Sequence, residues 1–174
     1  MPNFQPALIN YALWDPGEPA NFLGMADVVL PDIQHEIASI KGAGQGGTID
    51  YPIKGHYQNI VATFNFHTPT RDAIKFLRQR GRQLDLRGAV EEYDSGTGGL
   101  REVGVRVSMF TIPTGLNLGN FVVAEATGTS ATVTVMALTI YHGDDRLVEI
   151  DKVNLKAWFE DHDDLEEVRR ILGY

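Results

Sequence analysis

The sequence predicts a mainly β fold, an antiparallel β sandwich or barrel flanked by one or two short helices. Three observations lead to this prediction. Several segments alternate apolar and polar residues with a period of two, only two short segments carry helix signals, and the strands do not follow the βαβ order of a parallel sheet. The chain contains no repeat, linker or low-complexity tract, so residues 1–174 are expected to form a single domain.

The clearest strand covers residues 58–67. Its apolar face carries Ile60, Ala62, Phe64 and Phe66, and its mostly polar face carries Asn59, Thr63, Asn65 and His67. Residues 82–93 and 101–109 alternate in the same way, and residues 33–40 also favour a strand. These segments supply most of the predicted sheet.

A further strand is predicted over residues 130–142. Val133 and Val135 fall on one face, but the apolar positions then shift to Met136, Leu138 and Ile140. Such a phase change indicates a β-bulge or a strand covered on both faces. The turn HGDDR at 142–146 leads into LVEID at 147–151, which predicts a long hairpin.

Two helices are expected. The segment 70–81 can use Thr70 as its N-cap and Gly81 as its end, with an apolar stripe of Ala73, Ile74 and Leu77. The segment 161–173 has acidic residues at its start and Arg169 and Arg170 near its end, as the helix dipole favours. Its predicted buried stripe consists of Leu165, Val168 and Leu172.

Residues 42–47, GAGQGG, match the glycine pattern of dinucleotide-binding loops. That pattern binds pyrophosphate only where a strand precedes it and a helix follows it. Here the following residues include Pro52 and Gly55, which would break a helix within its second turn. The sequence therefore favours a long glycine-rich loop over residues 42–57, and apolar side chains in it indicate that it docks on a partner.

Composition limits the function classes. The chain has no cysteine, which excludes disulfides, thiolate metal sites and a cysteine nucleophile. Its net charge is −8, which disfavours a protein that grips phosphate backbones. The longest apolar run, 133–141, is far shorter than the ~20 residues that span a bilayer. The start of the sequence lacks the basic region of a signal peptide, so we expect a soluble protein made in the cytoplasm.

No group of residues indicates catalysis. The chain lacks the H-E-x-x-H, G-x-S-x-G and P-loop motifs. His142 with Asp144 and Asp145 is more typical of a hairpin turn than of a metal site, and the acids at 161–164 are expected from helix capping alone. Glu91 and Glu92 are adjacent on a strand and so face opposite sides. We expect no enzyme activity, no cofactor and no metal.

The landmarks of the chain occur in a definite order: VVLPDIQHEIASIKGAG at 28–44, an alternating strand, a short helix, ALTIYHGDDRLVEIDKVN at 137–154 and DLEEVRRILG at 164–173. In this order they resemble the major tail tube proteins of contractile-tailed bacteriophages, a family that also forms the tubes of R-type bacteriocins. The resemblance covers nearly the whole chain. It departs at WDPGEPANFLG, residues 14–24, which is longer and richer in proline than the tight Asp/Asn-Gly hairpin of the family.

The resemblance implies a structural protein of the phage virion, assembled in the cytoplasm of the bacterial host. Six copies would join strands into a continuous barrel, and the resulting hexameric rings would stack into a hollow tube that a contractile sheath drives through the host envelope. DNA would pass through as cargo without specific binding. The implied partners are further copies of this chain, the tail sheath protein, and the tape-measure, baseplate and tail terminator proteins, with no membrane anchor.

Two sets of residues gain candidate roles from this resemblance. An acidic lumen would repel phosphates, and its candidate residues are Asp85, Glu91 and Glu102. The loop at 42–57 is the candidate contact between stacked rings, through Gly42, Gly44, Gly47, Ile49, Tyr51, Ile53 and Tyr57. Closing a ring would also remove exposed strand edges, which otherwise promote aggregation.

Two alternatives remain open. The same architecture would suit the tube of a headless contractile particle, either an R-type bacteriocin or a secretion-system-like tube. A small ligand-binding β-barrel protein or an enzyme that uses the glycine loop is the alternative from another class, and it predicts a monomer or dimer that binds nucleotide.

Overall fold

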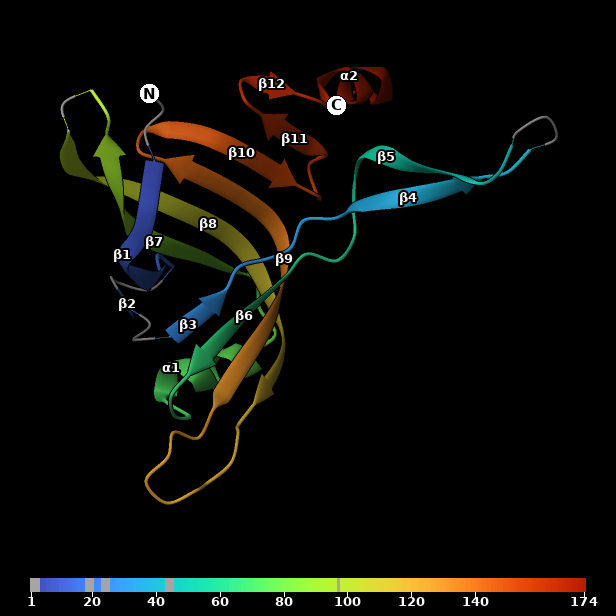
Figure 1. The fold of residues 1–174 in the computed structure, drawn as a ribbon. Coiled ribbons are helices and arrows are strands. Elements are labelled where there is room, and N and C mark those ends of the chain that lie inside the picture. Colours follow the sequence, from blue (N-terminus) through green and yellow to red (C-terminus); the bar gives the residue numbers. More distant parts are fainter. Residues whose placement is uncertain (1–3, 18–20, 23–25, 43–45, 97) are drawn as a thin grey trace.

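The computed structural model describes residues 4–17, 21–22, 26–42, 46–96 and 98–174 (Figure 1). In this part of the chain the strands are β1 (Phe4–Asp15), β2 (Asn21–Phe22), β3 (Ala26–Val29), β4 (His35–Ile40), β5 (Ile49–Tyr57), β6 (Val61–Phe66), β7 (Arg82–Asp94), β8 (Gly99–Asn117), β9 (Thr129–His142), β10 (Asp145–Asp151), β11 (Lys156–Phe159) and β12 (His162–Asp163). The helices are α1 (Arg71–Ile74), continued by the 3₁₀ turn η1 (Lys75–Leu77), and α2 (Glu166–Leu172).

Ten of these strands form one antiparallel sheet. Its main path runs β12-β11-β10-β9-β8-β7-β1-β2, and β6 joins it by pairing with β9 while β3 pairs with β6. β4 and β5 form a separate two-stranded sheet. The structure confirms the predicted antiparallel sandwich with short helices, and the strands described here do not close into a barrel.

β9 belongs to both layers of the sandwich, because its two halves pair with different strands on the side away from β8. Its first half, up to Thr134, pairs with β6, and its second half, from Ala137, pairs with β10. The register against β8 shifts between the two halves, since Phe110 pairs with Ala137 but Thr111 pairs with Val135. Met136 is therefore a bulge, which confirms the bulge predicted from the phase change. The predicted hairpin of β9 and β10 is also present.

The core lies where the bent sheet folds across itself. Buried side chains from β6 and the first half of β9 pack against those from β1, β7 and β8, and Phe76 of η1 closes one end against Phe64 and Phe66. The largest fully buried side chains are Phe64, Phe76, Leu13, Ile60, Leu84, Met109, Leu138 and Ile150. The alternating residues identified in the sequence thus supply most of this core.

The first helix is shorter than predicted. Thr70 is its N-cap as expected, because its Oγ1 accepts a hydrogen bond from Ala73 N at 3.2 Å. The helix ends at Leu77 rather than at Gly81, since Arg78 already has extended backbone angles and leads into β7. The predicted stripe is partly wrong: Ala73 and Phe76 are buried, whereas Ile74 and Leu77 are exposed.

The second helix is also shorter than the predicted 161–173. His162 and Asp163 form strand β12 against β11, so the helix begins only at Glu166 and ends at Gly173, whose φ of 82° suits glycine. Of the predicted buried stripe only Leu165 is buried, and Val168 and Leu172 are exposed. The helix therefore packs on the sheet through its start alone. No described helix is long and apolar enough to cross a membrane.

The prediction of a loop over 42–57 is wrong for most of that range. Ile49–Tyr57 is strand β5, which pairs with β4. Pro52 lies in this strand and is tolerated because the two-stranded sheet leaves every strand at an edge, where proline need not donate to a ladder. The backbone bends at Gly55, whose φ is +72° and where a Cβ would lie 2.4 Å from the Leu165 side chain.

Candidate functional site

The hairpin of β4 and β5 extends away from the rest of the molecule (Figure 1). Its register pairs Ile40 with Ile49 and Ala38 with Tyr51, so these four side chains share one face. The opposite face carries Ile37 and Pro52 together with Ser39 and Asp50, whose side chains are hydrogen-bonded at 2.6 Å. Toward the tip, one face of the hairpin thus carries only uncharged side chains and the other is mixed, while Glu36 lies on the first face near the base. The outer part of the first face is called the uncharged face.

The uncharged face is open to solvent, because Ile40, Ile49 and Tyr51 are each about half exposed. A two-stranded hairpin on its own is only marginally stable in water and gains stability by packing an apolar face on something else. Within the described residues no third strand pairs with β4 or β5. The hairpin therefore has the properties of a docking element that is completed by a partner.

The candidate residues of the predicted loop fall into two groups, one near the tip of the hairpin and one near its base. Gly42, Gly47, Ile49 and Tyr51 are exposed near its tip, and Gly44 lies outside the described residues. Ile53 and Tyr57 are half-buried toward its base, where the Tyr57 ring lies 5.1 Å from that of His35. Burial, and to a smaller extent the charge of Asp164, raise the pKa of Tyr57. Because a strand follows the glycines, this segment lacks the helix that a dinucleotide loop requires.

The three acidic candidates lie on one face of β7 and β8. Glu91 pairs directly with Glu102, and Asp85 lies on the same face of β7, six residues earlier. Glu102 is exposed and Glu91 is half-buried. Two carboxylates directly opposite each other repel, so this pair lowers the stability of the isolated chain.

Asp85, one of the lumen candidates, is a buried acid. Asp85 is only 1% exposed to solvent. Its carboxylate accepts hydrogen bonds from Arg106 at 2.5 Å, Ser108 at 2.8 Å and Arg87 at 3.3 Å. Burial by itself would raise the pKa of Asp85, but the hydrogen bonds and the charge of Arg106 together lower it below its usual value.

Replacing Asp85 with asparagine is expected to destabilise the protein in a pH-dependent way. Since the native pKa of Asp85 is lowered, its charged form stabilises the fold above the unfolded-state pKa of about 4, and this contribution is lost as the pH falls through the native pKa. The difference in unfolding free energy between wild type and Asp85→Asn should therefore be largest at neutral pH and shrink in acid. Urea unfolding at several pH values measures it, and a pH-independent difference would contradict the prediction.

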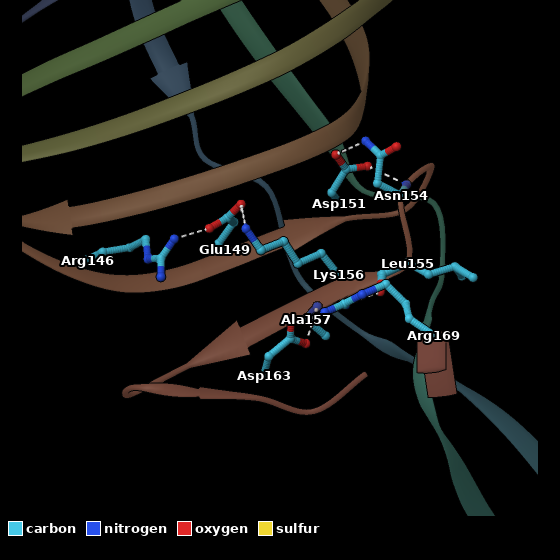
Figure 2. A network of polar contacts seen from close by, with 9 residues as sticks. All are labelled: Arg146, Glu149, Asp151, Asn154, Leu155, Lys156, Ala157, Asp163 and Arg169. Atoms are coloured by element: carbon cyan, nitrogen blue, oxygen red, sulfur yellow. Dashed lines mark hydrogen bonds and ion pairs between the residues drawn. The ribbon is translucent and has the colours of Figure 1, made fainter. Parts of the chain in front are cut away.

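A second polar network holds the C-terminal strands and α2 together (Figure 2). Glu149 pairs with Arg146 and, at 2.6 Å, with Lys156, so it joins β10 to β11. Asp163 pairs with Arg169 at 2.8 Å, and Arg169 also donates to the Leu155 carbonyl oxygen.

The charged side chains of this network form ion pairs that join β10, β11, β12 and α2. Arg146 also stacks over the Trp158 ring at 3.8 Å. Asp151 accepts a hydrogen bond from the Asn154 side chain at 2.6 Å and so fixes the turn between β10 and β11 (Figure 2).

Within the described ranges no three His, Asp or Glu side chains gather closely enough to hold a metal ion. Glu92, the other member of the adjacent glutamates, is buried and paired with Arg101 at 2.7 Å.

Two features were not identified in the sequence. One is the buried ion pair between Asp15 and Arg82, 67 residues apart, at 2.9 Å. The other is the segment 118–128 between β8 and β9, which exposes Phe121, Val122 and Val123. Three adjacent apolar residues beside Gly119 and Asn120 were a detectable signal for the second feature, whereas no local pattern indicates the first.

A protein-family model described as phage tail tube protein FII matches residues 7–173. No curated protein sequence matches the chain.

Proposed function

Because this chain belongs to the phage tail tube protein FII family and is therefore a structural component of the tail tube, we propose that six copies close into a ring and that rings stack into the inner tube of a contractile tail. The hairpin of β4 and β5 carries this proposal. It projects from the sandwich with an apolar face that nothing in the described chain covers, as expected of an element that binds a neighbouring copy.

The strand edges support self-assembly. Among the described strands, the main path of the sheet ends at the two-residue strands β2 and β12. Because β2 pairs with β1 at Trp14 and Asp15 alone, most of the 12-residue strand β1 also lies at an edge of the described sheet, where a second copy can add a strand. β5 has nine residues, and among the described strands it pairs with β4 alone, so its other edge is available for pairing with a second copy. A contact between different surfaces of identical copies forms a closed ring when the rotation between copies closes.

The charge supports a tube that conducts DNA without binding it. The net charge of −8 would repel phosphates electrostatically. The paired Glu91 and Glu102 are the remaining candidates for an acidic lumen, while Asp85 contributes little free charge because Arg87 and Arg106 neutralise it. In the proposed virion, the tube would contact the sheath outside and the tape-measure, baseplate and terminator proteins along its interior and at its ends.

The experiment is a size measurement on the purified chain. Light scattering and negative-stain electron microscopy should show rings or tubes with a central hole and sixfold symmetry. A monomer or dimer at all concentrations, together with nucleotide binding, would contradict the proposal. Particles isolated from the producing bacterium distinguish a phage tail from a headless particle. DNA-filled heads on the tubes would support the phage tail, and particles without heads would assign the tube to a bacteriocin-like or secretion-like particle.

A further inference from the structure

The segment 118–128 is an ordered apolar projection. It leaves the sandwich at the end of β8 and returns at the start of β9, at the foot of the molecule in Figure 1. At its tip Phe121 is 92% exposed and Val123 is 96% exposed, with Val122 between them. Residues 118–124 carry no charge. Large apolar side chains presented in this way mark a binding surface.

Hydrogen bonds at its base hold this projection in shape. Thr127 N donates to the His67 carbonyl oxygen at 2.9 Å, and Asn120 N donates to the Thr127 carbonyl oxygen at 2.9 Å. Gly119 has a φ of +76°, and a Cβ there would lie 1.8 Å from the Thr127 carbonyl oxygen, so the base requires glycine. The tip is therefore held ready to bind, and its binding does not require ordering a flexible loop.

An apolar groove lies elsewhere on the same chain. It has a volume of about 140 Å³ and is lined mainly by aliphatic side chains of β1, β7 and β8, with Val28 and Leu30 along one side. Leu8 and Leu30 at its rim are about half exposed. Gly88 forms part of its lining, where a Cβ would lie 2.8 Å from the Leu8 side chain. The lining contains no charged residue.

The tip and the groove are well separated along β8. Val105 in the first half of β8 lines the groove, and the tip follows Asn117, the last residue of the same strand. Twelve residues of strand separate these two positions, which is roughly 40 Å along the chain. The tip of one copy therefore does not fill its own groove, but it can enter the groove of a second copy.

We propose that the tip Phe121–Val123 of one copy inserts into the Leu8–Leu30 groove of a second copy and so joins successive rings of the tube. Both surfaces are uncharged and apolar, so their contact buries no unpaired charge. The narrow groove suits a protruding side chain such as Phe121 better than the flat ribbon of the hairpin. Because the tip and the groove are different surfaces of the same chain, the contact can repeat from copy to copy, and it generates an open stack when the rotation between copies does not close a ring. This inference rests on the proposed tube.

Cysteine cross-linking tests the contact, since the natural chain has no cysteine. A chain with Val123→Cys and Leu30→Cys should form a ladder of disulfide-linked multimers under mild oxidation of assembled tubes, because a disulfide requires the two Cα atoms to lie within about 7 Å. The matched competitor, Ile40→Cys with Leu30→Cys, tests whether the hairpin occupies the groove and should remain uncross-linked. Cross-linking of the competitor alone, or of neither chain, would overturn the inference.

A charge placed at the tip provides a second test. Phe121→Asp should still fold, as circular dichroism can verify, and should assemble no further than single rings. Ala126→Asp adds the same charge to the same exposed segment but keeps the apolar tip, and it should still form long tubes. Long tubes from Phe121→Asp would overturn this inference while leaving the proposed tube in place. If the wild-type chain formed neither rings nor tubes, the proposed function itself would fail.

Discussion

Replacing Asp15 with asparagine is expected to lower the free energy of unfolding by about 3–5 kcal/mol, because it leaves the Arg82 guanidinium buried without a counter-charge. The two side chains are almost completely buried and form an ion pair at 2.9 Å. Arg82 also donates to the Lys75 carbonyl oxygen at 3.1 Å, and Thr111 donates to the Arg82 carbonyl oxygen. The pair therefore joins the end of β1, the η1 turn and the start of β7.

Urea unfolding of the monomeric protein, followed by tryptophan fluorescence, measures the effect, and a fall in Tm of roughly 10 °C should accompany it. Glu167→Gln is the control, since Glu167 pairs with Arg170 on the surface and its loss should change stability by less than about 0.5 kcal/mol. The double variant Asp15→Leu with Arg82→Met should be more stable than Asp15→Asn, because it leaves no buried charge. A single variant as stable as wild type would show that the pair does not hold these elements.

Replacing Ile49 with aspartate is expected to abolish the assembly of rings and tubes while leaving the fold of the monomer intact. The change places a charge on the uncharged hairpin face, where docking on a neighbour would bury it without a partner. The sandwich should be unaffected, since Ile49 lies far out on the hairpin and contributes nothing to the core. Negative-stain microscopy and light scattering measure the loss.

Ile37 supplies a matched control on the opposite face of the same hairpin. Ile37 and Ile49 are both 52% exposed, so Ile37→Asp makes the same chemical change at the same exposure. It should reduce assembly far less than Ile49→Asp. Deleting residues 46–53 should remove assembly as completely as Ile49→Asp does. Long tubes from the deletion variant, or equal losses from the two aspartate variants, would refute the role given to the uncharged face.

The sequence alone determined the β-rich sandwich. The alternation in residues 58–67, 82–93 and 101–109 decides which side chains face the core, because a strand places successive residues on opposite faces. The same reasoning located the bulge in β9, where the alternation changes phase at Met136. The N-cap at Thr70 was also predictable, since capping is a local interaction between neighbouring residues.

Some boundaries and sites could not be predicted, because they depend on contacts between segments distant in sequence. The segment 49–57 contains Pro52 and Gly55, which locally favour a loop, yet pairing with β4 makes it a strand. Asp85 has the pattern of a polar surface residue, but Arg106 from the adjacent strand neutralises and covers it. The second helix lost its predicted stripe because only its start packs on the sheet.

One physical reason separates the features that the sequence determines from those that only the tertiary structure decides. Periodicity, caps and glycine turns act between residues close together in the chain, so the sequence determined several of the strands, their inward faces and the class of fold. Only the tertiary structure decided that Asp15 meets Arg82, that the β4–β5 hairpin has an uncovered face, and that the 118–128 tip is separated from the Leu8–Leu30 groove. These depend on how distant segments are placed relative to one another, and it is on them that the proposed assembly rests.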